Sequence, residues 1–200
     1  MSKIFLILLV ISMIAPGKVW AQITLNTPNV ESKLYLGKGH KQALIVGLGG
    51  SEGGNAWASE HWKGVREQFL AKGYAFLALG YFGAAGTPKL LDRIAIDEVY
   101  AAIKVAAVHP GVNPNKIAVV GGSRGGDLAL LLAAHYPDIR CVVALVPSHV
   151  AFPGNTPHLS TSAWKYQGQD MPFVPVNEAA FPFLLKKDLR GAFTAMLQDT

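Results

Sequence analysis

Four short apolar runs, each separated from the next by a stretch with helical spacing, constrain the fold of this chain more than any other feature. The runs cover residues 43–46, 75–79, 117–120 and 141–146, and the helical stretches between them cover about 56–72, 92–108 and 124–136. Runs without polar alternation indicate strands that are buried on both faces. Strands that alternate with helices build a parallel sheet covered by helices on both sides. We therefore predict an α/β fold.

The segments on either side of this pattern carry weaker signals. Residues 22–40 predict one or two edge strands ahead of the parallel part. Residues 147–182 contain six prolines and predict an irregular, lid-like excursion over the top of the sheet. A helix is expected from about residue 183 to the end. We expect residues 22–200 to form one domain.

The first 21 residues have the pattern of a signal peptide. A short basic start precedes a predominantly apolar run at residues 4–14, and Val19 and Ala21 suit a cleavage site. The run is too short to span a membrane, which takes about 20 residues. We therefore expect an exported protein, periplasmic or secreted, with no stable membrane span after cleavage. An uncleaved membrane anchor is the alternative.

Charge and cysteine content exclude several functions. Removal of the signal peptide takes away Lys3 and Lys18, so the net charge falls from +5 to +3 with no basic cluster, and we expect no nucleic-acid partner. The single cysteine, Cys141, leaves no partner for an internal disulfide and no cysteine pair for a zinc site. The histidines show no metal-binding spacing. We expect neither a metal nor a cofactor.

The clearest functional motif is Gly-x-Ser-x-Gly, formed by Gly121, Ser123 and Gly125 between the third apolar run and the helix that follows it. A strand that turns directly into a helix strains the residue between them, and side chains two residues before or after it would collide with neighbouring backbone. Ser123 is then exposed at the positive end of the helix. We interpret Ser123 as a catalytic nucleophile. The alternative is a glycine-rich turn with an incidental serine.

A serine nucleophile requires backbone N–H groups that stabilise the negative oxygen of the reaction intermediate, the oxyanion. The turn itself supplies the N–H of Arg124, and we expect the second donor, Gly50 or Ser51, in the glycine-rich loop 47–54 after the first apolar run. The competing interpretation of this loop is a dinucleotide-binding motif. That motif would need a third glycine where Glu52 stands, so a nucleotide cofactor is not expected.

Three stretches together resemble one known family. They are Gly-Gly-Ser-Glu-Gly-Gly at 49–54, Tyr-Phe-Gly-Ala-Ala-Gly-Thr-Pro at 81–88, and the stretch 121–139 that begins Gly-Gly-Ser-Arg-Gly-Gly. Over about residues 40–190 the chain is similar to the C-terminal catalytic domain of the bile acid-CoA:amino acid N-acyltransferase and acyl-CoA thioester hydrolase family. The resemblance implies an α/β-hydrolase fold, Ser123 as the nucleophile, and an acyl-enzyme formed from a thioester or ester. Eukaryotic members carry an N-terminal β-sandwich domain; we expect none here, and therefore expect hydrolysis by water rather than transfer to an amino acid.

The histidine and the carboxylate of a Ser-His-Asp triad are missing where the resemblance implies them. They should follow two further strands beyond the helix that starts near residue 183, and no apolar run remains there. We therefore expect a C-terminally truncated domain without its last two strands. His149, after the fourth run, either acts as a general base or lies at a lid hinge or on the surface. Tyr81 and Phe82, after the second run, either wall an acyl pocket or pack as ordinary core.

Two functional hypotheses follow. In the first, the chain is part of an active, exported serine hydrolase whose substrate is a small-molecule thioester or carboxylic ester. In the second, it is a non-catalytic or degenerate α/β-hydrolase in which the run 141–146 becomes an exposed sheet edge that needs a partner and allows oligomers to form.

Overall fold

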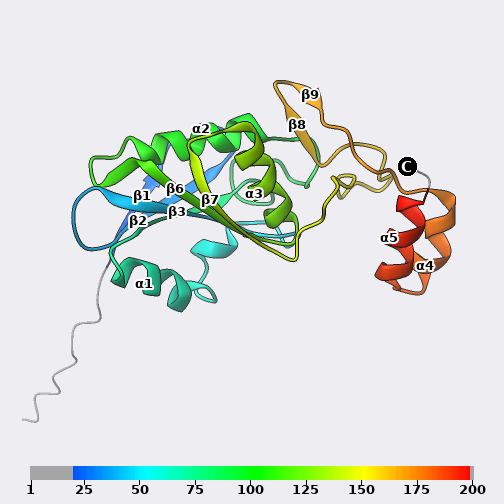
Figure 1. The fold of residues 1–200 in the computed structure, drawn as a ribbon, viewed down its shortest axis with the longest axis horizontal. Helices are drawn as coiled ribbons and strands as arrows, with labels where there is room; N and C mark the ends of the chain where they lie inside the picture. Colours follow the sequence, from blue (N-terminus) through cyan, green and yellow to red (C-terminus); the bar gives the residue numbers. More distant parts are fainter. Residues whose placement is uncertain (1–19, 199–200) are drawn as a thin grey trace, which may run out of the picture.

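The computed structural model describes residues 20–198, which fold around a six-stranded sheet (Figure 1). The strands are β1 (Ala21–Leu25), β2 (Glu31–Leu36), β3 (Gln42–Leu48), β4 (Ala75–Gly80), β6 (Val112–Gly122) and β7 (Ile139–Leu145). They lie in the order β1-β2-β4-β3-β6-β7. The last four strands in this order are parallel to one another. At the other edge, β2 pairs antiparallel with β4, and β1 pairs antiparallel with β2. The four expected parallel strands and the expected edge strands are therefore confirmed.

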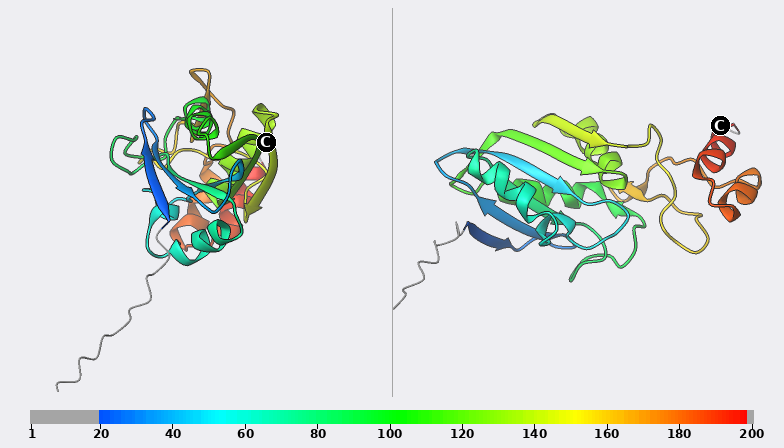
Figure 2. Two further views of the ribbon diagram at one scale, coloured as in Figure 1. Left: turned by 90° about the vertical axis from the view of Figure 1, so that its left-hand side faces the viewer. Right: turned by 90° about the horizontal axis from the view of Figure 1, so that it is seen from below.

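Helices cover both faces of the sheet, as predicted. On one face lie α2 (Ile96–Ala107) and α3 (Arg124–His135), and on the other lies α1 (Lys63–Ala71) with the short 3₁₀ helix η1 (Ala56–Ala58) (Figures 1 and 2). Strand β4 shows the division, because its side chains alternate between two cores. Leu77 packs in the core that includes α2 and α3, whereas Phe76 packs against Trp57 and Leu70 on the other face.

The helix expected over residues 56–72 is divided into η1 and α1. The indole N–H of Trp57 donates to the carbonyl of Leu48, 3.1 Å away, at the end of β3. The guanidinium of Arg66 in α1 donates to the carbonyl of Trp57. These bonds hold residues 56–58 as a separate turn beneath the glycine-rich loop, so a continuous helix does not form.

The segment after β7 is less irregular than expected. Strands β8 (Trp164–Tyr166) and β9 (Gln169–Asp170) form a hairpin, and β8 also pairs with β5 (Ile94–Ala95). The hairpin turns at Gln167 and Gly168, whose φ angles are 50° and 80°. Two positive φ angles are typical of the tight hairpin turn that matches strand twist. The prediction of an irregular excursion was therefore wrong for residues 164–170, which form this hairpin.

The expected C-terminal helix is divided into 3₁₀ helix η2 (Glu178–Ala180), α4 (Phe181–Leu185) and α5 (Leu189–Leu197). The chain reverses at Lys187, with φ of 57°, and the carboxylate of Asp188 then accepts from the N–H of Gly191 at 2.9 Å. Such an N-cap starts a new helix. Figures 1 and 2 show α4 and α5 beyond the end of the sheet at which the parallel strands finish.

Strand β7 forms one edge of the sheet, and no strand within residues 20–198 pairs with its outer side. Cys141 is exposed, and Val143 and Leu145 are 48% and 53% exposed. None of the helices in this described part of the chain is long and apolar enough to cross a membrane. The predicted signal peptide lies, except for its last two residues, outside the described residues.

Candidate active site

Ser123 occupies a strained turn between β6 and α3. Its φ and ψ are 51° and −124°, a conformation that residues with a side chain rarely adopt. The N–H of Ser123 donates to the carbonyl of Leu145 in β7 at 2.9 Å, and its carbonyl accepts from the N–H groups of Gly126 and Asp127 at 2.8 and 3.1 Å. The side chain is exposed, and its hydroxyl makes no hydrogen bond to any residue in the range 20–198. The backbone thus fixes the serine while its oxygen stays accessible.

The two motif glycines are required by close backbone contacts. A Cβ on Gly121 would lie 2.1 Å from the carbonyl oxygen of Gly125, and a Cβ on Gly125 would lie 2.3 Å from that of Gly49. By contrast, a Cβ on Gly122 would meet nothing within 4 Å. The tight approach of β6, α3 and the glycine-rich loop therefore leaves no room for a side chain at either motif position.

The glycine-rich loop brings Gly50 next to Ser123. A Cβ on Gly50 would lie 3.5 Å from the Cβ of Ser123. The N–H of Gly50 already has a partner, because it donates to Oε1 of Glu52 at 2.9 Å. The N–H of Arg124 is one of the donors that the first turn of a helix leaves without an intrahelical partner, and it makes no hydrogen bond within the described residues. Ser51, the alternative donor, is exposed.

Tyr81 and Phe82 lie in the interior and do not line the cavity at Ser123. They are 2% and 6% exposed, and the ring of Tyr81 packs against Phe82 and Trp164. The Tyr81 hydroxyl donates to the carbonyl of Gly49 at 2.6 Å. Burial, and then the charge of Glu52, raise the pKa of Tyr81 well above its ordinary value. The structure therefore gives Tyr81 a role in holding the glycine-rich loop, which the sequence pattern did not suggest.

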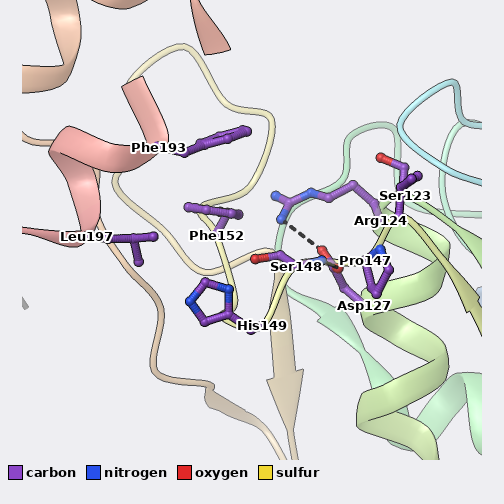
Figure 3. Close-up of a pocket in the computed structure, with 10 residues that line it drawn as sticks. Ser123, Arg124, Asp127, Pro147, Ser148, His149, Phe152, Phe193 and Leu197 are labelled. Atoms are coloured by element: carbon purple, nitrogen blue, oxygen red, sulfur yellow. Dashed lines mark hydrogen bonds and ion pairs between the residues drawn. The ribbon is translucent and has the colours of Figure 1, made fainter. Parts of the chain in front are cut away.

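A cavity of about 310 Å³ opens between Ser123 and the C-terminal helices (Figure 3). It is lined by Ser123, Arg124, Asp127, Val146, Pro147, Ser148, His149, Phe152, Phe193 and Leu197. His149 therefore shares this cavity with the predicted nucleophile. Figure 3 shows its imidazole on the side where Phe152 and Leu197 lie, away from Ser123. No hydrogen bond joins His149 to Ser123 in this part of the chain.

The first turn of α3 also holds the segment that follows β7. The guanidinium of Arg124 donates to the carbonyl of Pro153 and lies 3.6 Å from the carboxylate of Asp127. That carboxylate accepts from the N–H of Ser148 at 2.7 Å. Burial raises the pKa of Asp127, although the Ser148 bond and the Arg124 charge oppose the shift. Sequence reasoning missed this contact, because no local pattern relates residues 124–127 to residues 148–153.

Comparisons with known proteins bear on the family and on the fold. Residues 99–188 match the family model described as BAAT / Acyl-CoA thioester hydrolase C terminal. The chain is 32% identical over 113 residues to human mitochondrial acyl-coenzyme A thioesterase 2, which covers 56% of the chain and 22% of that protein. It is 33% identical over 139 residues to mouse acyl-coenzyme A thioesterase 6, covering 68% of the chain and 31% of that protein. The chain thus spans less than a third of the length of these relatives.

Solved structures with the same fold include the α/β hydrolase GrgF from a Penicillium species, with a TM-score of 0.53 and 16% identity over 65% of this chain and 46% of that one. An esterase from Pyrococcus furiosus gives a TM-score of 0.52 and 23% identity over 64% of this chain and 49% of that one. At these identities the likeness concerns the fold alone. The expected α/β-hydrolase-like fold is confirmed. Within residues 20–198 no group of three or more potential metal ligands comes together.

Proposed function

Residues 99–188 belong to the C-terminal domain family of acyl-CoA thioester hydrolases and BAAT, and on this premise we propose that the chain carries the nucleophilic part of a serine hydrolase. Its substrate is a small-molecule thioester or carboxylic ester, and the reaction proceeds through an acyl-enzyme at Ser123. The observation that carries the proposal is the exposed, strained Ser123 between β6 and α3. Strain of this kind, held by surrounding backbone, is a feature of functional sites.

The expected chemistry follows from the groups around Ser123. The Ser123 oxygen attacks the acyl carbon and gives a tetrahedral intermediate with a negative oxygen. The N–H groups of Arg124 and Gly50 are the proposed donors to that oxygen, and we favour Gly50 over Ser51 because Gly50 lies against Ser123. The intermediate then expels the thiolate or alkoxide, and water releases the acid from the acyl-enzyme.

The thioester is the better substrate for this site on chemical grounds. An ordinary thiol has a pKa of about 8.5, so a thiolate leaves with little help from a general acid. An alkoxide is far more basic and needs a proton. His149 is the proposed base because it lines the cavity with Ser123, and the alternative role at a lid hinge stays open beside it. The apolar side chains of Phe152, Phe193 and Leu197 suit an acyl chain.

We also propose that the protein is exported, from the basic start and apolar run of residues 1–21. Acyl-CoA thioesters are made in the cytosol, so an exported enzyme would act on other thioesters or esters. Cell fractionation of the full chain tests this point. Recovery of protein beginning at residue 22 outside the cytoplasm supports export, and recovery of the intact chain in the cytosol contradicts it.

Labelling with a fluorophosphonate probe tests the nucleophile. We expect the wild-type protein to be labelled on Ser123, and Ser123→Ala to reduce labelling to background while leaving the far-UV circular dichroism unchanged. Ser160→Ala is the matched control, because Ser160 is exposed and does not line the cavity. The two substrate classes are then compared by two rates: thiol release from an acyl thioester, and p-nitrophenol release from the p-nitrophenyl ester of the same acyl group. His149→Ala should slow both reactions if the imidazole accepts the Ser123 proton.

The exposed edge of β7 favours the second candidate, a non-catalytic protein that acts with a partner. Val143 and Leu145 are about half exposed on that strand, and an unpaired apolar edge is a template for another strand. Absence of labelling in well-folded wild-type protein, together with self-association measured by sedimentation, would favour this candidate over the hydrolase.

A further inference from the structure

The carboxylate of Glu52 occupies a donor that the proposed reaction needs. The N–H of Gly50 points at Oε1 of Glu52, with 2.9 Å between nitrogen and oxygen. A Cβ on Gly50 would lie 2.8 Å from Oε2 of Glu52 and 3.5 Å from the Cβ of Ser123. The space of one methyl group therefore separates a negative charge from the side chain of the proposed nucleophile.

The peptide unit between Gly49 and Gly50 is held from both sides. Its carbonyl accepts from the Tyr81 hydroxyl at 2.6 Å, and its N–H donates to Glu52. Tyr81 is almost fully buried and fixed among aromatic rings, so it sets the direction in which the opposite N–H points. The N–H is thus oriented without Glu52, and the carboxylate acts as a ligand of a donor that is already in place.

Glu52 is free to leave this position. The residue is exposed, and the Gly50 N–H is the only hydrogen-bond donor that its carboxylate has within residues 20–198. An oxyanion must lie about 2.7–3.1 Å from the same nitrogen. Two oxygens cannot both occupy that place, because each would fill the same position at the Gly50 nitrogen, and two negative charges so close repel each other.

We propose that the Glu52 carboxylate fills the oxyanion-binding position in the free protein and that an acyl substrate must displace it to react at Ser123. The inference rests on the proposed function, since it assigns Gly50 as an oxyanion donor. It makes Glu52 an internal competitor of the substrate carbonyl. Removal of the carboxylate should therefore raise reactivity, whereas a residue that merely positions the loop would lower it.

The rate of fluorophosphonate labelling at Ser123 distinguishes these outcomes. Because a hydrogen bond to a charged group is lost on displacement, we expect Glu52→Ala to speed labelling about tenfold. Glu52→Gln keeps a neutral, weaker acceptor and should give a smaller increase. Glu60→Gln is the control, because Glu60 pairs with Lys63 at the surface and should leave the rate unchanged. An unchanged or slower rate in Glu52→Ala overturns the proposal.

A binding measurement separates this proposal from the proposed function. In the amide NMR spectrum, addition of acetate should shift the Gly50 signal of Glu52→Ala and leave that of the wild-type protein unchanged. Equal shifts in both proteins, or none in either, overturn the proposal whether or not Ser123 reacts. If no protein is labelled but the Gly50 signal responds as expected, the hydrolase assignment fails and the anion site at Gly50 stands.

Discussion

The sheet region, residues 21–145, and the segment 146–198 are held together in different ways. Side chains in the sheet region such as Leu77, Ile103 and Leu128 are fully buried in the large core on the α2 and α3 face of the sheet, to which Trp164 of the later segment also contributes. Beyond the β8–β9 hairpin, the later segment has a small separate cluster that includes Ala192 and Met196, and its helices leave large apolar side chains in solvent. The most exposed of these side chains are Phe181, Leu185 and Leu189, at 51%, 86% and 58% exposed.

This difference matters for the cavity, because its two walls come from the two regions. Ser123 and Arg124 lie at the end of the sheet, where close backbone contacts and hydrogen bonds fix the conformation of the turn. Phe193 and Leu197 lie on α5, which is packed over a small area. Elements with few buried apolar contacts open at lower free energy than the core. The proposed nucleophile is therefore on the stable side, and the wall proposed to face the acyl chain is on the less stable side.

A glycine substitution in the elbow, the turn from Gly121 to Gly125 that carries Ser123, tests the rigid wall of the cavity and gives the largest expected effect. Gly125→Ala places a methyl group 2.3 and 2.6 Å from two backbone oxygens, which cannot move as a side chain can. We expect the free energy of unfolding to fall by about 3 kcal/mol or more. Gly122→Ala meets nothing within 4 Å and should stay within about 0.5 kcal/mol of wild type. Urea denaturation of both variants measures the difference; equal stabilities would contradict the description of the elbow.

Matched truncations in the sheet core and in the C-terminal cluster directly test the difference in stability between the two regions. Leu77→Ala empties a fully buried site and should lower the free energy of unfolding of the whole sheet region by about 3 kcal/mol. Met196→Ala removes a side chain that is almost as buried, yet we expect the urea midpoint of the sheet region to change little, while cleavage by a protease within 177–197 becomes faster. If Met196→Ala shifts the main transition as much as Leu77→Ala, the two regions unfold as one unit.

Two ion pairs provide the smallest effect: one lies within the sheet region, and the other joins the sheet region to the later segment. Asp138 accepts from Tyr100 and from Lys104 at 2.8–2.9 Å. Burial acts to raise the pKa of Asp138, but these hydrogen bonds outweigh it and hold the pKa below the ordinary value. The pair therefore contributes stability at pH values above the unfolded pKa of about 3.9 and loses it as the pH falls through the lower folded value.

Because Lys104 is 43% exposed, solvent screening limits the effect of Asp138→Asn to about 0.5–1 kcal/mol at pH 7. Thermal unfolding at pH 7 and at pH 2 should show this loss shrinking in acid. Asp170→Asn, which breaks a more exposed pair with Arg93 near β9, should cost less than about 0.5 kcal/mol at pH 7. A larger loss for Asp170→Asn would show that the later segment is held to the sheet region more firmly than the exposure of this pair indicates.

The sequence predicted the sheet region well because local pattern and burial agree there. Runs such as 75–79 and 117–120 are apolar at consecutive positions, and only a strand covered on both faces accommodates them. The elbow followed from a motif whose glycines are dictated by short-range backbone geometry. The sequence alone therefore indicates three candidate groups: Ser123, Gly50 and the N–H of Arg124.

The later segment was predicted less well because its structure depends on contacts between distant residues. Strand β8 exists because it pairs with β5, which lies 70 residues earlier in the register Ile94 to Trp164. The break between α4 and α5 did have a local signal, an aspartate at 188 placed three residues before Gly191. The contacts of Arg124 with Pro153 and of Tyr81 with Gly49 had none, because they join side chains to backbone far along the chain.

Cys141 gives β7, the edge strand of the sheet, a unique site for chemical labelling. It is the one thiol in the sequence, and it is exposed on that strand. A fluorophore attached there would report on its surroundings without any further engineering. A second molecule or another segment of the chain that pairs with β7 would slow the labelling reaction and change the emission of the fluorophore. Pairing at this sheet edge can therefore be measured in solution.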